Sequence, residues 1–326
     1  MDLDSPPTTL YNMDELTRAP DLWFEDCGLI IQAEKTIFRV SRDFLALQSP
    51  VFRDMLSLPP PKTADMMLGC PFVFLPDSAQ DVTVFLKALI FHDFFEPYPA
   101  PTSLDVLIGV LRLSHKYEVH SLRKRALVHI SAGHPTSLEA YDAWEQEPQP
   151  AWLLEAIDRN EALLPILARQ LSIPWILPIA FYHDCKHMSE RCILKSPQSL
   201  EDKTLVITAC RTLEGTAVSE MLNFLWADDE PEDEDCVSPI RCMVSRTGMR
   251  RIAEGRRERS TATAPIFPLE IWRPEDWDAL FVCGPCLASM KDAYEGARKA
   301  FWDDLPDMFD LPPWDELEKL KAEALK

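Results

Sequence analysis

The sequence contains one motif that is typical of redox chemistry, the Cys283-Gly-Pro-Cys286 dithiol. A catalytic C-x-x-C pair needs a reactive thiolate at the start of a helix, directly after a strand, within a thioredoxin-like fold. A helix can begin here, but the 40 residues after Cys286 do not provide the further strands, helix and cis-proline loop of such a fold. The position before the motif, usually Trp in those enzymes, is Val282. We therefore expect a non-catalytic role for these thiols.

Two further cysteines, Cys236 and Cys242, point to a metal site. Together the four follow the pattern C-x5-C…C-x2-C, with 40 residues between the two halves. Four thiolates at about 2.3 Å from the ion form the tetrahedral ligand set of a structural zinc site. The C-x2-C half has typical spacing, whereas the C-x5-C half is loose and the connection is long. Two interpretations stay open, a closed structural zinc site or four ordinary thiols.

Other patterns that support chemistry are weak or absent. His183 and His187 stand four residues apart on one expected helix, but no third ligand accompanies them, so we expect a partly exposed helix face. The sequence has no G-x-G, no G-K-[ST], no G-x-S-x-G and no H-E-x-x-H motif, which excludes the common nucleotide-binding, hydrolase and zincin signatures. We expect that the protein is not an enzyme. The remaining cysteines are expected to act as small hydrophobic residues: Cys27, Cys70, Cys185, Cys192 and Cys210.

Composition limits the partners. The chain has 326 residues, enough for about two domains, and a formal net charge of −20. Such a charge repels nucleic acid and anionic membranes, and no apolar run is long enough to span a bilayer. Nine cysteines without a secretory signal indicate reduced thiols, hence the cytoplasm or the nucleus. We expect protein partners and no membrane association, and we regard nucleic-acid binding as disfavoured.

The chain begins with an expected tail over residues 1–20, followed by a mixed α+β domain over 21–135. Alternating apolar residues predict a strand hairpin over 29–40 and a buried strand over 71–75. Helices are expected to begin after Ser41, Ser49, Ser78 and Ser103, because serine is a preferred N-cap residue.

The rest of the chain is predicted to be mainly helical. Residues 136–227 form an expected helical domain, with helices over 151–171, 174–188 and 199–226. Residues 228–264 combine an acidic run with an arginine run and lack a hydrophobic period, which predicts a charged flexible loop. We favour pairing between these two runs over a nuclear-import or nucleic-acid patch. Residues 265–326 are expected to form C-terminal helices that carry the Cys283–Cys286 pair.

Three segments of the first domain resemble a BTB/POZ domain. They are EDCGLIIQAEKTIFRVSRDFLALQSPVFRDMLS (25–57), FVFLPDSAQDVTVFLKALIF (72–91) and LRLSHKYEVHSLRKRALVHI (111–130). The whole chain is similar to fungal, basidiomycete-type BTB proteins, in which a helical region, a late cysteine pair and an LPPW ending follow, here LPDMFDLPPWDEL (305–317). Ser41 stands where that family usually has His.

The resemblance implies a non-catalytic protein-interaction module that self-associates or acts as an adaptor or scaffold. Candidate contact residues are Phe44, Leu47, Phe52 and Met55, although their helical spacing also fits a core. A homodimer is one expectation. The alternatives are a transcription- or chromatin-associated factor with a structural zinc knuckle and, more weakly, a cullin-type ubiquitin-ligase adaptor. The latter is disfavoured because residues 56–71 contain no Glu for the hydrophobic-x-Glu element of cullin-recruiting relatives.

Overall fold

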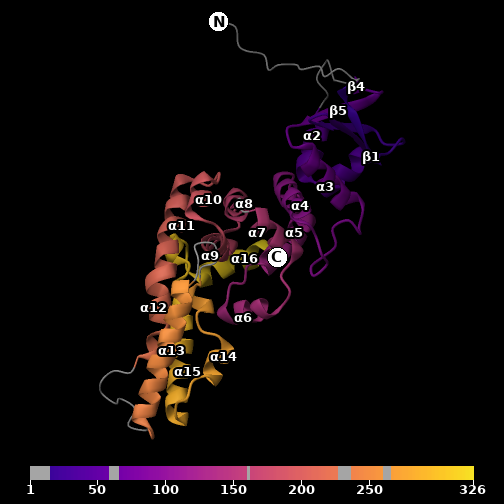
Figure 1. The fold of residues 1–326 in the computed structure, drawn as a ribbon. Helices are drawn as coiled ribbons and strands as arrows, with labels where there is room; N and C mark the ends of the chain where they lie inside the picture. Colours follow the sequence, from indigo (N-terminus) through magenta and orange to yellow (C-terminus); the bar gives the residue numbers. More distant parts are fainter. Residues whose placement is uncertain (1–14, 59–65, 160–161, 227–235, 260–265) are drawn as a thin grey trace. The chain divides into compact units, whose positions relative to one another are not determined.

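The structure is a computed structural model that describes residues 15–58, 66–159, 162–226, 236–259 and 266–326. It divides into two compact units, Met1–Ile130 and Ser131–Lys326 (Figure 1). The sequence placed this boundary near residue 135. The predicted α+β class is correct, because one small mixed sheet lies in the N-terminal unit and helices make up most of the rest.

The N-terminal unit is built on a five-stranded sheet. Its strands are β1 (Thr17–Trp23), β2 (Leu29–Ala33), β3 (Thr36–Val40), β4 (Met66–Met67) and β5 (Cys70–Leu75), in the order β1-β3-β2-β5-β4. The predicted hairpin is confirmed, since β2 and β3 pair antiparallel, and β5 joins β2 in parallel. All five residues of β2 are buried. Because successive side chains of a strand point to opposite faces, both faces of the sheet are covered at β2.

Five helices accompany this sheet: α1 (Arg42–Gln48), α2 (Pro50–Ser57), α3 (Ala79–Ile90), α4 (Leu104–Lys116) and α5 (His120–Ala132). The four predicted serine caps are confirmed, because each hydroxyl accepts the N–H of the residue three positions later. In the core, the Phe52 ring stacks on Tyr117 at 4.6 Å between centroids. Helix α4 packs closely on α3 at Gly109, where a Cβ would lie 2.4 Å from Val84 Cγ2.

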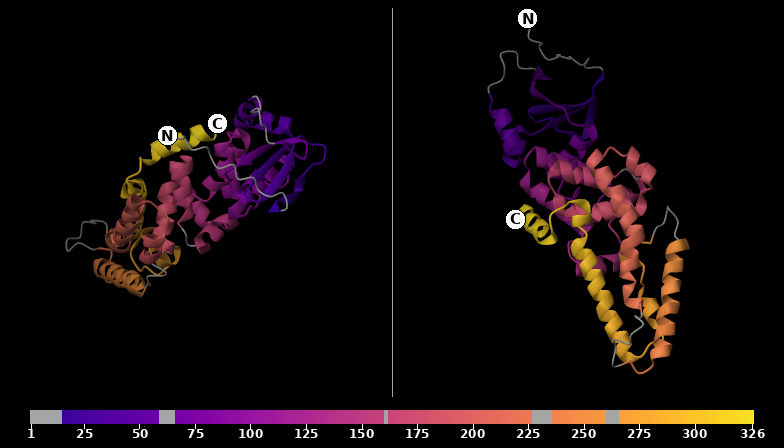
Figure 2. Two further views of the ribbon diagram at one scale, coloured as in Figure 1. Left: turned by 90° about the horizontal axis from the view of Figure 1, so that it is seen from above. Right: turned by 90° about the vertical axis from the view of Figure 1, so that its left-hand side faces the viewer.

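The described part of the C-terminal unit is helical. Its α-helices are α6 (Leu138–Gln146), α7 (Ala151–Arg159), α8 (Leu163–Leu171), α9 (Leu177–His187), α10 (Glu190–Lys195), α11 (Leu200–Thr212), α12 (Val218–Met221), α13 (Pro239–Arg259), α14 (Pro274–Asp278), α15 (Gly284–Asp304) and α16 (Trp314–Ala324). A π-helical turn, Leu213–Ala217, joins α11 to α12. Figure 2 shows α13 in orange and α15 in yellow as the two longest helices of this unit. None of the described helices combines the length and apolar character needed to cross a bilayer.

Three predictions about the elements were wrong. Strand β1 begins at Thr17, inside the expected N-terminal tail. The helix expected over 151–171 is two helices, because Ala162 has a left-handed φ of 50° that ends helical geometry. The segment 239–259 is helix α13 and not a flexible loop; the acidic run at 228–235 lies outside the described residues.

The hydrophobic period of the sequence did not predict helix α13, because arginines occupy much of its packed face. Arg246 and Arg250 donate to the backbone carbonyls of Phe224 and Leu222, at the end of the preceding helical segment. Arg250 is itself buried. A long side chain can pack its aliphatic stem while its guanidinium finds carbonyl acceptors, so a helix can be anchored with few apolar residues.

Candidate metal centre

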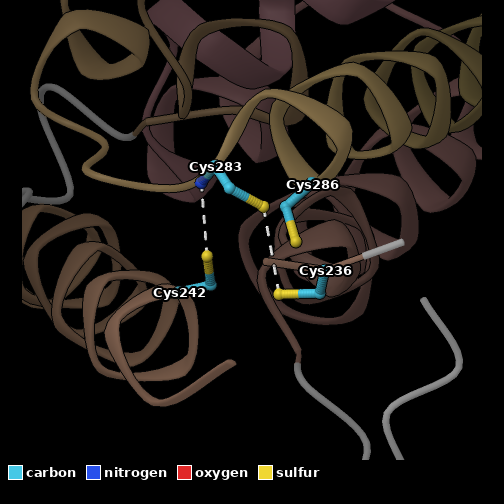
Figure 3. Close-up of side chains that lie close together, drawn as sticks. All are labelled: Cys236, Cys242, Cys283 and Cys286. Carbon is cyan, nitrogen blue, oxygen red and sulfur yellow. Dashed lines mark hydrogen bonds between the residues drawn. The ribbon is translucent and has the colours of Figure 1, made fainter. Parts of the chain in front are cut away.

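The four cysteines predicted as metal ligands come together in the C-terminal unit. Their Sγ atoms all lie within 4.8 Å of one another, and no other group of three or more His, Cys, Asp or Glu side chains within the described ranges could hold a metal ion. Cys236 precedes α13, Cys242 lies in the first turns of α13, and Cys283 and Cys286 lie at the start of α15 (Figure 3). The 40-residue connection is therefore spanned by α13, α14 and the segments between them.

The start of α15 explains how one C-x2-C pair presents both sulfurs to the same point. Cys283 is the N-cap of this helix, and Pro285 stands in its first turn, where proline is tolerated. Residues three apart at a helix start lie on the same side, so Cys283 and Cys286 face the cluster together. The backbone N–H of Cys283 donates to Cys242 Sγ at 3.2 Å, which links the two helix starts directly (Figure 3).

The spacing of the sulfurs suits a tetrahedral ion. A zinc–sulfur distance of about 2.3 Å implies sulfur–sulfur separations of about 3.8 Å in a regular tetrahedron. Cys283 Sγ and Cys236 Sγ lie 3.9 Å apart. Three of the four side chains are buried and Cys236 is half-buried. A buried set of four soft ligands with no additional position fits a structural zinc ion, and all nine cysteines are free of disulfides.

The thiols differ in how readily they ionise. Hydrogen bonding from the backbone N–H of Cys286 is the main cause that lowers the pKa of Cys283 to about 6. Burial raises the pKa of both Cys242 and Cys286. Hydrogen bonding thus favours the thiolate of Cys283, whereas Cys242 and Cys286 ionise readily only beside a positive charge. A divalent metal supplies that charge, and binding would release protons.

The cluster also forms its own small packed centre. Cys242, Cys283 and Cys286 are buried against one another, with the half-buried Cys236 and Val282 packed on them. No large aliphatic or aromatic core residue belongs to this group. The sulfurs therefore occupy the place that a hydrophobic cluster has elsewhere in the unit.

The two histidines that stand four residues apart in α9, His183 and His187, differ in exposure. His183 is buried rather than partly exposed, and its ring stacks on Trp144 at 5.6 Å. Burial holds the pKa of His183 well below its usual range, so the ring is neutral. His187 is exposed, and its ring centroid lies 6.0 Å from that of His183.

Comparison with protein-family models, with curated proteins and with solved structures found no match to this chain. Its function is therefore inferred from its own residues.

Of the candidate contact residues, Leu47 has 79% of its surface exposed, and Phe44 and Met55 are half-buried. Phe52 is fully buried, so assigning it to a contact surface was wrong.

The arginine run makes contacts inside the unit. Arg256 forms a two-pronged ion pair with Asp276, and Arg257 donates to Ser219 Oγ at 3.0 Å. Together with Arg246 and Arg250, which donate to backbone carbonyls, four arginines of the run make contacts within the C-terminal unit. The acidic run, with which we predicted pairing, lies outside the described residues. The helix still exposes Arg241, Arg251 and Arg259.

Sequence reasoning missed a polar network around Glu270. Its carboxylate accepts from Lys186 Nζ at 3.0 Å and from the hydroxyls of Tyr141 and Tyr182 at 3.1 and 3.3 Å. Burial raises the pKa of both tyrosines, so the phenols stay protonated and donate. These residues hold α6, α9 and the segment before α14 together. The sequence gives no signal for them, because 84 to 129 residues separate each donor from Glu270.

Proposed function

We propose that this chain is a non-catalytic protein-interaction protein, with a BTB/POZ-like recognition unit at its N-terminus and a structural zinc ion in its C-terminal unit. The observation that carries the proposal is the N-terminal arrangement of a strand hairpin, two short helices and a further strand that joins β2 in parallel. That order of short strands under helices is what the resemblance implies. Self-association or adaptor binding follows from the resemblance and is part of the proposal.

The zinc part of the proposal is supported by the closed set of four sulfurs. With four protein ligands, an ion at this point would have no position for water or substrate, which is typical of structural and not catalytic zinc. The ion would connect the segment before α13 to the start of α15. Elemental analysis of the purified protein tests it, and one zinc per chain is the expected result.

Light scattering of the full-length protein at micromolar concentration tests the interaction part. A dimer mass, reduced towards the monomer by Leu47→Asp, is the expected result. Leu200→Asp is the matched control, since Leu200 is also 79% exposed but lies at the start of α11 in the other unit. A clean monomer mass for the unmodified protein would remove self-association. Affinity purification with mass spectrometry would then look for adaptor partners lost in Leu47→Asp alone.

A transcription- or chromatin-associated role is the second candidate. It is favoured by the cysteine cluster beside α13, whose exposed arginines include Arg241 and Arg251. The engagement of four other arginines in the fold and the net charge of −20 oppose it. A mobility-shift assay on duplex DNA at low salt separates the two roles. Salt-sensitive binding would support the second candidate, and no shift would discard it.

A further inference from the structure

A groove with a volume of about 630 Å³ opens on the C-terminal unit. Its walls are the start of α6, the C-terminal half of α15 and the first turns of α16, all labelled in Figure 1. Sites that bind ligands commonly have volumes of about 300–1,000 Å³. All of its lining residues lie within this one unit, and none belongs to the cysteine cluster.

Two tryptophans give the groove a rigid wall. The rings of Trp302 and Trp314 are stacked, with centroids 5.0 Å apart and planes only 8° from parallel. Trp314 Nε1 donates to the Trp302 carbonyl at 2.7 Å, which fixes the start of α16 on the end of α15. Leu138 and Pro313 add further apolar surface to the lining. Trp302 and Trp314 expose only 3% and 9% of their surfaces, so methylene groups of a ligand would contact the small parts of these residues that face the groove.

The charges around the groove favour a cationic ligand. Five carboxylates line it, those of Glu139, Glu295, Asp303, Asp315 and Glu318, against the single ammonium of Lys299. This ratio of 5 to 1 far exceeds the 53 to 33 of the whole chain, so the acidity is local and not only an average property.

Two of these carboxylates are available for a partner. Glu295 pairs with Arg298 at 3.6 Å and Asp315 pairs with Lys319 at 2.9 Å. Glu139 and Asp303 are exposed and form no salt bridge with any residue in the described part of the chain. They stand on different helices, α6 and α15, at separate points of the lining.

We propose that this groove binds an arginine- or lysine-rich segment of a partner protein. Long basic side chains combine an apolar stem, which suits the tryptophan wall, with a charged head that reaches the carboxylates. The volume accommodates several side chains and not only a single small cation. The proposal goes beyond the N-terminal interaction unit and does not depend on zinc, so either can fail without the other.

Fluorescence anisotropy of the full-length protein with a labelled peptide tests the proposal. The probe is a decapeptide with five arginines, and its reference replaces each arginine with citrulline, which keeps the shape and removes the charge. At 150 mM salt we expect binding of the arginine peptide at least ten-fold tighter than the reference. The double variant Glu139→Gln/Asp303→Asn should weaken it about five-fold, because an ion pair of an exposed carboxylate contributes only modestly to affinity.

The matched control is Asp158→Asn/Asp292→Asn, which changes the net charge equally at exposed positions outside the groove. It should leave the affinity unchanged. Hydrogen exchange should show peptide-dependent protection at residues 136–139, 299–303 and 313–318. Equal weakening by both double variants would mean that only the overall charge attracts the peptide, and the proposal would be overturned. It would also be overturned by equal binding of the citrulline peptide, or by no binding at 1 mM.

Discussion

Replacing one cysteine of the cluster should remove most of the metal-dependent stability of the C-terminal unit. Cys286→Ser is the most informative change, because Cys286 is buried and lies in the first turn of α15. The substitution replaces the sulfur with a hydroxyl oxygen, which is of similar size but is a poor zinc ligand. The three remaining thiols form an incomplete site. We expect Cys286→Ser to bind zinc weakly and to unfold at a lower temperature than the zinc-loaded wild type.

The size of the effect follows from linkage. A ligand that binds only the folded state stabilises it by about 4 kcal/mol when its free concentration is 1,000 times the dissociation constant. For a unit the size of Ser131–Lys326, each kcal/mol shifts the melting temperature by about 2–4 °C. Removing zinc from the wild type should therefore lower its melting temperature by about 8–16 °C, and the variant should show a much smaller response to zinc.

Tryptophan fluorescence during thermal unfolding provides the readout, because eight of the nine tryptophans lie in residues 131–326. Each protein is measured with equimolar zinc and after exhaustive chelation. Cys27→Ser is the control, since Cys27 is a half-buried thiol of the N-terminal unit. It should keep the full zinc response. The reasoning is refuted if the wild type melts at the same temperature with and without zinc, or if Cys286→Ser responds as strongly as Cys27→Ser.

Three further changes test the packing and the buried charge. Gly109→Ala places its Cβ 2.4 Å from Val84 Cγ2, so urea unfolding should show a net loss of about 1–2 kcal/mol. Gly248→Ala meets no atom within 4 Å and should stabilise α13 by about 0.5–1 kcal/mol; opposite signs would contradict the described packing. Burial raises the pKa of Asp184 to about 7, so the folded chain keeps a proton that the unfolded chain loses above about pH 4. This carboxyl therefore lowers stability as pH rises from about 4 to 7. Asp184→Asn should unfold at higher urea than the wild type at pH 8, by up to about 4 kcal/mol, and a lower midpoint would count against this assignment.

Strands β2, β3 and β5 and the helices of the N-terminal unit were predictable because local signals and burial agree there. Ser49 precedes Pro50, and the structure places that serine as the cap of α2, with its hydroxyl also donating to the Tyr117 carbonyl. Strand β2 consists of apolar residues apart from Gln32, as expected for a strand covered on both faces. In such segments the hydrophobic period and the cap residues indicate the same boundaries.

Other elements escaped prediction because distant contacts decide them. Strand β1 contains Pro20, which local propensity disfavours in a strand, yet it pairs with β3 at the edge of the sheet. Helix α13 has little apolar character, and its arginines find carbonyl and carboxylate acceptors that lie far away in the sequence. The residues that pair with β1 or accept from the arginines of α13 cannot be identified from the local sequence around either element.

The cysteine cluster lies between these cases. The residue types and the Cys283–Cys286 spacing indicated a metal, but two interpretations remained open, because nothing local fixes the distance across 40 residues. The structure brings Cys236 Sγ to 3.9 Å from Cys283 Sγ. That proximity depends on the path of α13 and α14, which the sequence did not predict. The spacing of the cysteines could identify candidate ligands, but only the fold shows that all four lie close together.

The burial pattern of α13 gives a reason for a metal at this end of the unit. After Cys242, the next buried residue of the helix is Met249, seven positions later. Ile240 and Val244 point outward, with 78% and 62% of their surfaces exposed, so they contribute little to holding the helix start in place. Cys242 is then the only buried anchor of the first ten residues. If zinc binds as proposed, its coordination holds the start of α13 in place, as burial of apolar residues does for other helices. Loss of the ion should therefore release the start of α13 before the rest of the unit unfolds.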